Sequence, residues 1–189
     1  MTKSVMIVGV GGQGSLLASK LLGKLAMLKG LDVKVSEVHG MSQRGGSVVT
    51  YVRFGEKVYS PIIAEGEADI IISFEKLEAA RYAKFLKPGG KIIVNTQTID
   101  PMPVIIGAAE YPHDVLEQLK AKGVDVCELD ALTLANQAGS SKAVNIVLMG
   151  KAAKQFDIEY ASWISAIEAT VAARFIELNK KAFELGYNS

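Results

Sequence analysis

Some residue types are scarce in this chain of 189 residues, and each scarcity excludes a class of site. The sequence has one cysteine, Cys127, so no disulfide can form within the chain, and the four thiolates that an iron–sulfur cluster usually needs are missing. The two histidines, His39 and His113, are too few with one cysteine for a structural zinc site. We therefore expect no metal and no redox centre on this chain, and a reducing environment.

The chain also has no large excess of positive or negative charge and no long apolar run. The chain carries 21 Lys and Arg against 20 Asp and Glu, mixed along its length, which argues against a nucleic-acid partner. No apolar run approaches the roughly 20 residues of a membrane helix, and the polar start Met1-Thr2-Lys3-Ser4 is unlike a signal peptide. We expect a cytoplasmic protein without a membrane partner, folded as a single domain over residues 1–189.

Apolar strands alternate with helices along the chain. The strands are predicted at 5–8, 32–38, 47–54, 69–72, 91–95 and 124–129, and this alternation favours an α/β fold. The expected architecture is Rossmann-like and doubly wound, with a mostly parallel sheet and helices on both faces. The turn Gly55-Glu56 predicts a hairpin that runs into residues 57–60. Ser73 is expected to cap the next helix, which should end at Pro88-Gly89-Gly90.

The C-terminal segment predicts one long helix over about residues 160–185. Its apolar stripe has helical spacing and comprises Tyr160, Ile164, Ile167, Val171, Phe175, Leu178 and Ala182. A second face carries Ala166, Ala169 and Ala173, small residues that would let another helix of this domain or of a partner approach closely. Asn145 falls in an otherwise apolar helix, so it is either part of a core hydrogen-bond network or an interface contact. Cys127 is expected to be a small core residue.

A glycine-rich turn directly follows the first strand. Gly9, Gly11 and Gly14 match G-x-G-x-x-G, and Gly12 and Gln13 complete the turn. Such a turn lets the backbone approach a phosphate at a helix N-terminus, so Gly9, Gly11, Gly12, Gln13 and Gly14 are candidate binding residues. The same turn can also serve only to pack the helix on the strand. Glu37 follows Gly14 by 23 residues and is either a ribose ligand, as in NAD proteins, or a solvated side chain.

The loop from His39 to Ser47 is longer than a simple connection requires. It places polar and charged side chains between glycines, which favours a binding surface over a plain solvated loop. The candidates for an interface or an active-site wall are His39, Ser42, Gln43, Arg44, Gly45 and Gly46.

Four stretches together resemble the gamma-type domain of 2-oxoacid:ferredoxin oxidoreductases, and most closely its indolepyruvate branch. They are VGVGGQG at 8–14, EVHGMSQRGGSV at 37–48, VYSPI at 58–62 and NKKAFELGY at 179–187. The resemblance covers essentially the whole chain. It implies an accessory subunit of a complex that oxidatively decarboxylates indolepyruvate or another aryl pyruvate to an acyl-CoA, with ferredoxin as the electron acceptor.

The resemblance also implies where the cofactors lie. Thiamine diphosphate, Mg and 4Fe-4S clusters belong to a large alpha subunit, the complex uses coenzyme A, and no catalytic residue is implied on this chain. The glycine-rich turn would then be a loop for an anion or a coenzyme A phosphate. A stand-alone NAD(P)-binding or nucleotide-binding protein is the alternative, although no Tyr-x-x-x-Lys pair or acid–base residue for hydride transfer can be assigned.

Overall fold

The computed structural model describes residues 2–40 and 45–189. Its strands are β1 (Lys3–Val10), β2 (Asp32–His39), β3 (Ser47–Gly55), β4 (Ala68–Ser73), β5 (Leu86–Asn95) and β6 (Asp125–Leu129). Its α-helices are α1 (Ser15–Leu28), α2 (Lys76–Tyr82), α3 (Met102–Ile105), α4 (Val115–Ala121), α5 (Ala131–Ala138), α6 (Val144–Ala153), α7 (Tyr160–Thr170) and α8 (Ile176–Asn188). Short 3-10 turns lie at Ala83–Phe85, Ser141–Ala143 and Ala173–Phe175.

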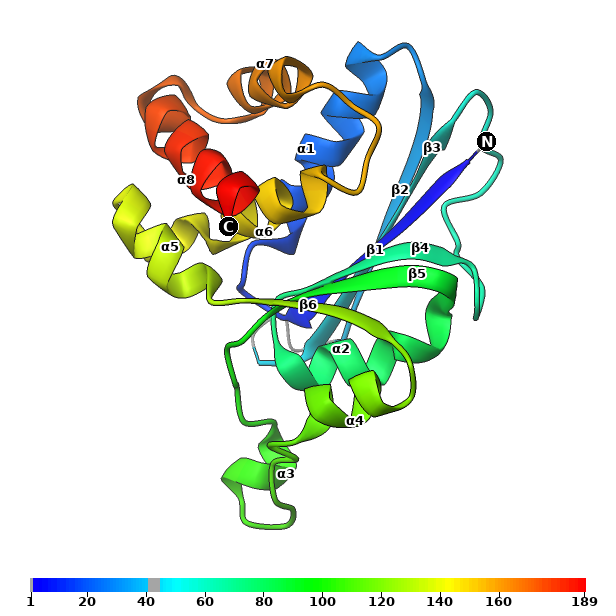
Figure 1. Cartoon of the computed structure of the whole chain (residues 1–189), viewed down its shortest axis with the longest axis vertical. Helices are drawn as coiled ribbons and strands as arrows, with labels where there is room; N and C mark the ends of the chain where they lie inside the picture. The colour runs from blue at the N-terminus through cyan, green and yellow to red at the C-terminus, as the bar shows by residue number, and fades with distance from the viewer. Residues whose placement is uncertain (1, 41–44) are drawn as a thin grey trace.

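The strands form one sheet in the order β2-β3-β1-β4-β5-β6. Three of its neighbouring pairs are parallel (β1 with β4, β4 with β5, β5 with β6), while β3 runs antiparallel to both β1 and β2. Helices α1 and α5–α8 cover one face of the sheet, and α2 and α4 cover the other (Figure 1). Two separate apolar cores result, one under each helical layer. The predicted α/β doubly wound fold with a mostly parallel sheet is confirmed.

The antiparallel pairing lies elsewhere than the sequence predicted. Residues 57–60 form no strand, so the expected hairpin after Gly55 is wrong. Asp32 instead accepts a hydrogen bond from the Val58 N–H at 2.9 Å, and Arg53 donates to the Ile62 carbonyl at 2.9 Å. These bonds hold the segment as an irregular connection. The hairpin is formed by β2 and β3, whose register runs from Asp32 opposite Gly55 to His39 opposite Val48.

Two boundaries around α2 also differ from expectation. Glu75, not Ser73, caps the helix, because its carboxylate accepts the Glu78 N–H at 3.0 Å while the Ser73 hydroxyl donates to the Glu75 carbonyl. The segment Pro88-Gly89-Gly90 does not end a helix but lies inside β5, at an irregularity in its pairing with β4.

The expected long C-terminal helix is two helices. Val171 and Ala172 adopt extended backbone angles, so α7 ends at Thr170 and α8 turns back to pack on α6. A Lys180–Glu168 ion pair of 2.6 Å bridges the break. The turn places α8 against α6, where Phe183 is completely buried.

The close helix contact forms through glycines. A Cβ at Gly150 of α6 would lie 2.1 Å from the Phe183 carbonyl oxygen, and one at Gly186 of α8 would lie 2.0 Å from the Val147 oxygen. Of the predicted alanine face, Ala166 is buried, but Ala169 and Ala173 are exposed. The three alanines therefore do not form one face packed on a helix of this domain, and their contact with a helix of a partner stays a prediction. Within the described residues, no helix is both long and apolar enough to cross a membrane.

Candidate functional site

The glycine-rich turn joins β1 to α1 where the strands of the sheet end. Gly12 and Gly14 have φ angles of +103° and +89°, which glycine adopts without steric cost. Gly14 also touches the start of α6, since a Cβ there would lie 2.8 Å from Nδ2 of Asn145. That amide donates to the Gly14 carbonyl at 3.2 Å, so Asn145 belongs to a hydrogen-bond network inside this domain, the first of its two expected roles.

Two clefts flank the turn. One of about 400 Å³ is lined by Gly11, Gly12 and Gly14 together with Glu37 and His39. The other, of about 550 Å³, is lined by Gly12, Gln13 and Gly14 together with residues that include Gln97 and Lys142. Because Gly14 caps α1 without a side-chain hydrogen bond, the first N–H groups of this helix have no capping side chain. The site can therefore bind an anion through backbone N–H groups, with the Lys142 ammonium as a nearby positive charge.

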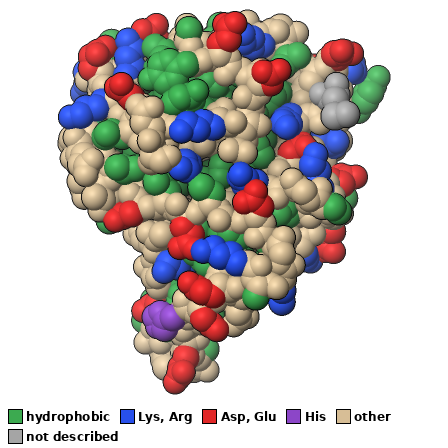
Figure 2. Space-filling view, viewed as in Figure 1, with side chains coloured by type: hydrophobic (Ala, Val, Ile, Leu, Met, Phe, Trp, Pro, Cys, Tyr) green, Lys and Arg blue, Asp and Glu red, His purple; other side chains and the backbone are tan. Residues whose placement is uncertain are grey.

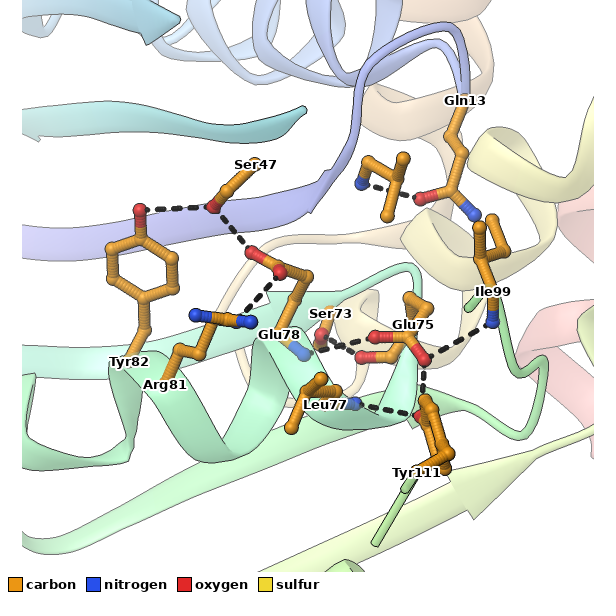
Figure 3. Close-up of polar contacts among 11 residues, drawn as sticks. Gln13, Ser47, Ser73, Glu75, Leu77, Glu78, Arg81, Tyr82, Ile99 and Tyr111 are labelled. Carbon is orange, nitrogen blue, oxygen red and sulfur yellow. Dashed lines mark hydrogen bonds and ion pairs between the residues drawn. The ribbon is translucent and has the colours of Figure 1, made fainter. Parts of the chain in front are cut away.

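The Gln13 side chain fastens the turn to the sheet. Its carbonyl accepts the Val10 N–H at 2.8 Å (Figure 3). Its NH₂ donates to the Phe74 carbonyl at 3.1 Å and to the Gln97 side-chain oxygen at 3.4 Å. The Asn95 amide donates to the same Phe74 carbonyl at 3.2 Å. Both polar groups of the Gln13 side chain thus form hydrogen bonds within the chain. A ligand at the turn would therefore contact the backbone of the turn.

The end of the predicted binding loop is attached to the same turn. Gly11 N–H donates to the Gly46 carbonyl at 2.8 Å, and Gly45 N–H donates to the Gly11 carbonyl at 3.5 Å. The two candidate stretches are therefore neighbours in space, which the sequence did not predict. His39 lies exposed at the end of β2. Ser42, Gln43 and Arg44 lie outside the described residues.

Glu37 shares the smaller cleft with the glycine-rich turn, but its strand is displaced from β1. In a dinucleotide-binding fold the second strand lies directly beside the first. Here β3 separates β2 from β1, which adds one strand spacing of about 4.8 Å. Glu37 is exposed and accepts the Thr50 hydroxyl at 3.3 Å. This geometry favours the solvated reading of Glu37 over the ribose ligand.

The sequence did not predict two buried carboxylates at the start of α2, those of its N-cap Glu75 and of Glu78. Glu75 is 1% exposed and accepts hydrogen bonds from the Tyr111 hydroxyl, the Ile99 N–H at 3.3 Å and the Glu78 N–H. Glu78 is 5% exposed; it accepts the Ser47 hydroxyl and pairs with Arg81 at 3.1 Å. Figure 3 shows this chain of contacts, which runs from the first residue of β3 through α2 to the segment before α4.

Burial governs the protonation of two groups in this chain of contacts. Burial raises the pKa of the Glu78 carboxyl, and the Ser47 hydroxyl and the Arg81 guanidinium partly counteract it. Burial also raises the pKa of Tyr111, and its bond to the Glu75 carboxylate raises it further. Tyr111 therefore stays protonated and acts as a donor to Glu75.

The metal-ligating side chains that the structure describes do not assemble into a site. No group of three or more His, Cys, Asp or Glu suited to a metal ion occurs in residues 2–40 and 45–189. Cys127 packs partly buried against the apolar core, as expected for a small core residue. With one cysteine in the whole sequence, this donor set does not fit an iron–sulfur cluster.

Comparison with known proteins gives a consistent match over the chain. Residues 4–189 match the family described as Pyruvate ferredoxin/flavodoxin oxidoreductase. The Indolepyruvate oxidoreductase subunit IorB of Thermococcus kodakarensis is 43% identical over 188 residues, covering 97% of this chain and 93% of that protein. The IorB subunit of Archaeoglobus fulgidus is 41% identical over 194 residues, covering 100% of this chain and 95% of that protein.

Solved structures with the same fold come from the same group of enzymes. The gamma subunit of a keto/oxoacid ferredoxin oxidoreductase from Geobacter sulfurreducens aligns with a TM-score of 0.72 at 22% identity, covering 98% of this chain and 96% of that chain. The 2-oxoglutarate:ferredoxin oxidoreductase of Magnetococcus marinus, with 2-oxoglutarate, coenzyme A and succinyl-CoA bound, aligns with a TM-score of 0.74 at 18% identity. That alignment covers 99% of this chain and 30% of the longer chain.

Proposed function

The chain belongs to the pyruvate ferredoxin/flavodoxin oxidoreductase family, and from this premise we propose that it is the accessory subunit of an indolepyruvate:ferredoxin oxidoreductase. The complex would oxidatively decarboxylate indolepyruvate or a related aryl pyruvate to the acyl-CoA and pass the electrons to ferredoxin. The observation that carries the proposal is the identity of 43% to the IorB subunit of Thermococcus kodakarensis over 97% of the chain.

The division of labour follows from the side chains that are available. Thiamine diphosphate, Mg and 4Fe-4S clusters would supply carbanion and electron-transfer chemistry, and one cysteine cannot hold such clusters. We assign these groups to a large alpha subunit, through which ferredoxin is also reached. This chain contributes backbone donors at the glycine-rich turn and a surface that completes the complex.

The glycine-rich turn is proposed as the subsite for a coenzyme A phosphate. Its support is the cleft of about 550 Å³ lined by Gly12, Gly14 and Lys142, at a helix N-terminus without a side-chain cap. A longer relative with the same fold, from Magnetococcus marinus, has coenzyme A bound. Gly9, Gly11 and Gln13 would shape this turn, since the Gln13 amide and the Gly11 N–H are used within the chain.

The loop from His39 to Gly46 is proposed as a contact surface or active-site wall in the complex. Its support is the attachment of Gly45 and Gly46 to Gly11, which brings the end of the loop to the turn. Ser42, Gln43 and Arg44 remain predicted contacts, and an arginine there suits a carboxylate or phosphate because its guanidinium binds both in a bidentate manner.

Reconstitution tests the subunit role. The chain should co-purify with a large subunit from its native host, and the complex should reduce a dye with indolepyruvate and coenzyme A. The isolated chain should be colourless and inactive. Stoichiometric iron–sulfur absorbance in the pure chain, or full activity of the large subunit alone, would refute the proposal.

A second experiment tests the loop. Arg44→Ala should reduce assembly or turnover while it changes the free energy of unfolding by no more than about 0.5 kcal/mol, as is usual for surface substitutions. Arg174→Ala, at an exposed arginine near α8, is the matched control and should leave activity unchanged. If both variants support full activity, Arg44 has no role in the complex, and if Arg44→Ala unfolds, the loop is structural.

A further inference from the structure

A projecting arm, defined as residues 99–111, carries apolar side chains into solvent. It leaves the body of the molecule after β5 and includes α3, which stands away from the sheet and both helical layers (Figure 1). Met102 is 64% exposed, Ile105 66% and Ile106 69%. Three large apolar side chains together on one projection form a contiguous exposed patch, which in a folded protein marks a binding surface.

The arm is ordered by its own hydrogen bonds. Ile105 N–H donates to the Pro101 carbonyl at 3.1 Å, and the N–H groups of Ala108 and Ala109 both donate to the Pro103 carbonyl at 2.8 and 3.1 Å. Gly107, with φ of +72°, ends the helical turn as glycine commonly does. The apolar side chains are therefore presented on a preformed knob, which lowers the entropy cost of binding.

Both ends of the arm are fixed to one buried carboxylate. Glu75 accepts the Ile99 N–H at one end and the Tyr111 hydroxyl at the other. The same helix, α2, holds Ser47 through Glu78. Glu75 and Glu78, at the start of α2, thus contact both the arm and the first residue of β3 (Figure 3). β3 begins directly after the loop that is proposed to contact the large subunit.

The charge around the arm has one sign. Residues 92–119 contain Asp100, Glu110, Asp114 and Glu117 but no lysine or arginine. Acidic side chains accordingly gather at the projecting end of the molecule in Figure 2. Two arms meeting each other would bring like charges together, which costs binding energy. The pattern fits an apolar pocket with lysine or arginine at its rim.

We propose that the arm is the docking element for the large subunit, which offers it an apolar pocket rimmed by basic side chains. The inference rests on the proposed function, because the large subunit is the partner that function requires. Met102 and Ile106 enter the pocket, while Asp100 and Glu110 meet its rim.

The test compares binding of matched variants to the large subunit. Met102→Ser and Ile106→Ser should each weaken the dissociation constant at least tenfold, because buried apolar anchors carry much of an interface's energy. Met27→Ser on α1 is the control, since Met27 is 63% exposed but lies off the arm, and it should change the constant less than twofold. All three side chains are exposed, so the melting temperatures of the isolated variants should match that of the wild type.

A charge reversal tests the rim. Glu110→Lys should weaken binding severalfold at low salt, and the difference should shrink as salt is added, because screening reduces the attraction. Glu184→Lys, at an exposed glutamate of α8, is the control. Unchanged or tighter binding by Glu110→Lys overturns the basic rim.

The remaining outcomes separate this inference from the proposed function. If the wild-type chain does not bind the large subunit, the proposed function fails. If it binds and both arm variants bind equally well, the docking proposal fails alone. Sedimentation of the isolated chain supplies the last comparison. If the wild-type chain is a dimer and the Met102→Ser variant is a monomer, the arm binds a second copy of this chain and the proposal is overturned.

Discussion

Alanine at Gly150 should destabilise the protein by about 2 kcal/mol. The new Cβ would lie 2.1 Å from the Phe183 carbonyl oxygen, whereas ordinary contacts begin near 3.4 Å, so α6 and α8 must separate. Overpacking of this kind costs about 1–3 kcal/mol, and a gap of about 1 Å forfeits much of the dispersion attraction between the helices. Replacing a glycine by alanine inside a helix by itself stabilises the folded state by about 1 kcal/mol, which is less than the cost of the clash.

Gly23 of α1 provides a matched control. It is also a helical glycine, but its Cβ would lie 3.9 Å from the nearest atom, a methyl group of Val35. Gly23→Ala should therefore stabilise the protein by up to about 1 kcal/mol. For a domain of this size each kcal/mol shifts the melting temperature by about 2–4 °C. Gly150→Ala should melt about 4–8 °C below the wild type, and Gly23→Ala slightly above it.

The pair Gly150 and Gly186 offers a further check by urea denaturation. Both residues lie at one helix contact, so the double alanine variant should cost less than the sum of the single variants, because the first substitution already separates the helices. An equal rise in stability for Gly150→Ala and Gly23→Ala would refute the reasoning from close contact.

Three further predictions concern the candidate site. Because burial raises the pKa of Glu78, the folded state holds that proton more tightly than the unfolded chain, and stability is lost as pH rises through the raised pKa. Glu78→Gln removes this loss, so its stability relative to wild type should improve as the pH rises above about 4, the ordinary glutamate pKa; parallel urea-denaturation profiles of the two proteins would contradict this. Tyr111→Phe removes a donor from the buried Glu75 carboxylate and should cost about 1–3 kcal/mol in thermal melts, whereas Tyr59→Phe, at a residue 88% exposed, should cost nothing; equal effects would argue against the buried network. Millimolar NAD or NADP should not raise the melting temperature. A ligand at a hundred times its Kd would add about 2.7 kcal/mol to the free energy of unfolding. A rise in melting temperature with NAD or NADP but not with phosphate would revive the oxidoreductase alternative.

The sequence predicted those features that local patterns encode. The short apolar runs gave the six strands, and the glycines after Val8 gave the turn into α1. The order of the strands was not predictable from such patterns, because periodicity does not encode which strand is a neighbour. The antiparallel β3 therefore sits unexpectedly between β1 and β2.

The break between α7 and α8 shows the same limit. The stripe from Tyr160 to Ala182 keeps helical spacing through Val171, and neither glycine nor proline interrupts it. The break comes from tertiary contact, because α8 gains its close packing on α6 only by turning back. Local propensity is a weak guide where packing decides.

The buried carboxylates escaped notice for a related reason. A glutamate in the first turn of a helix is ordinarily solvated and complements the helix dipole. Glu75 and Glu78 are buried by partners distant in sequence, Tyr111 and Ser47. Their spacing of three residues at a helix start, which is the spacing of a capping box, is the one local signal that was available.

The position of β2 at the edge of the sheet has a consequence for aggregation. An edge strand leaves one row of backbone donors and acceptors without a partner strand, which can recruit strands from other molecules. β2 carries the exposed apolar residues Val35 and Val38, and Lys34, Ser36 and Glu37 interrupt them. The charged pair Lys34 and Glu37 thus disfavours edge-to-edge association, so these two side chains help keep the folded chain dispersed at high concentration.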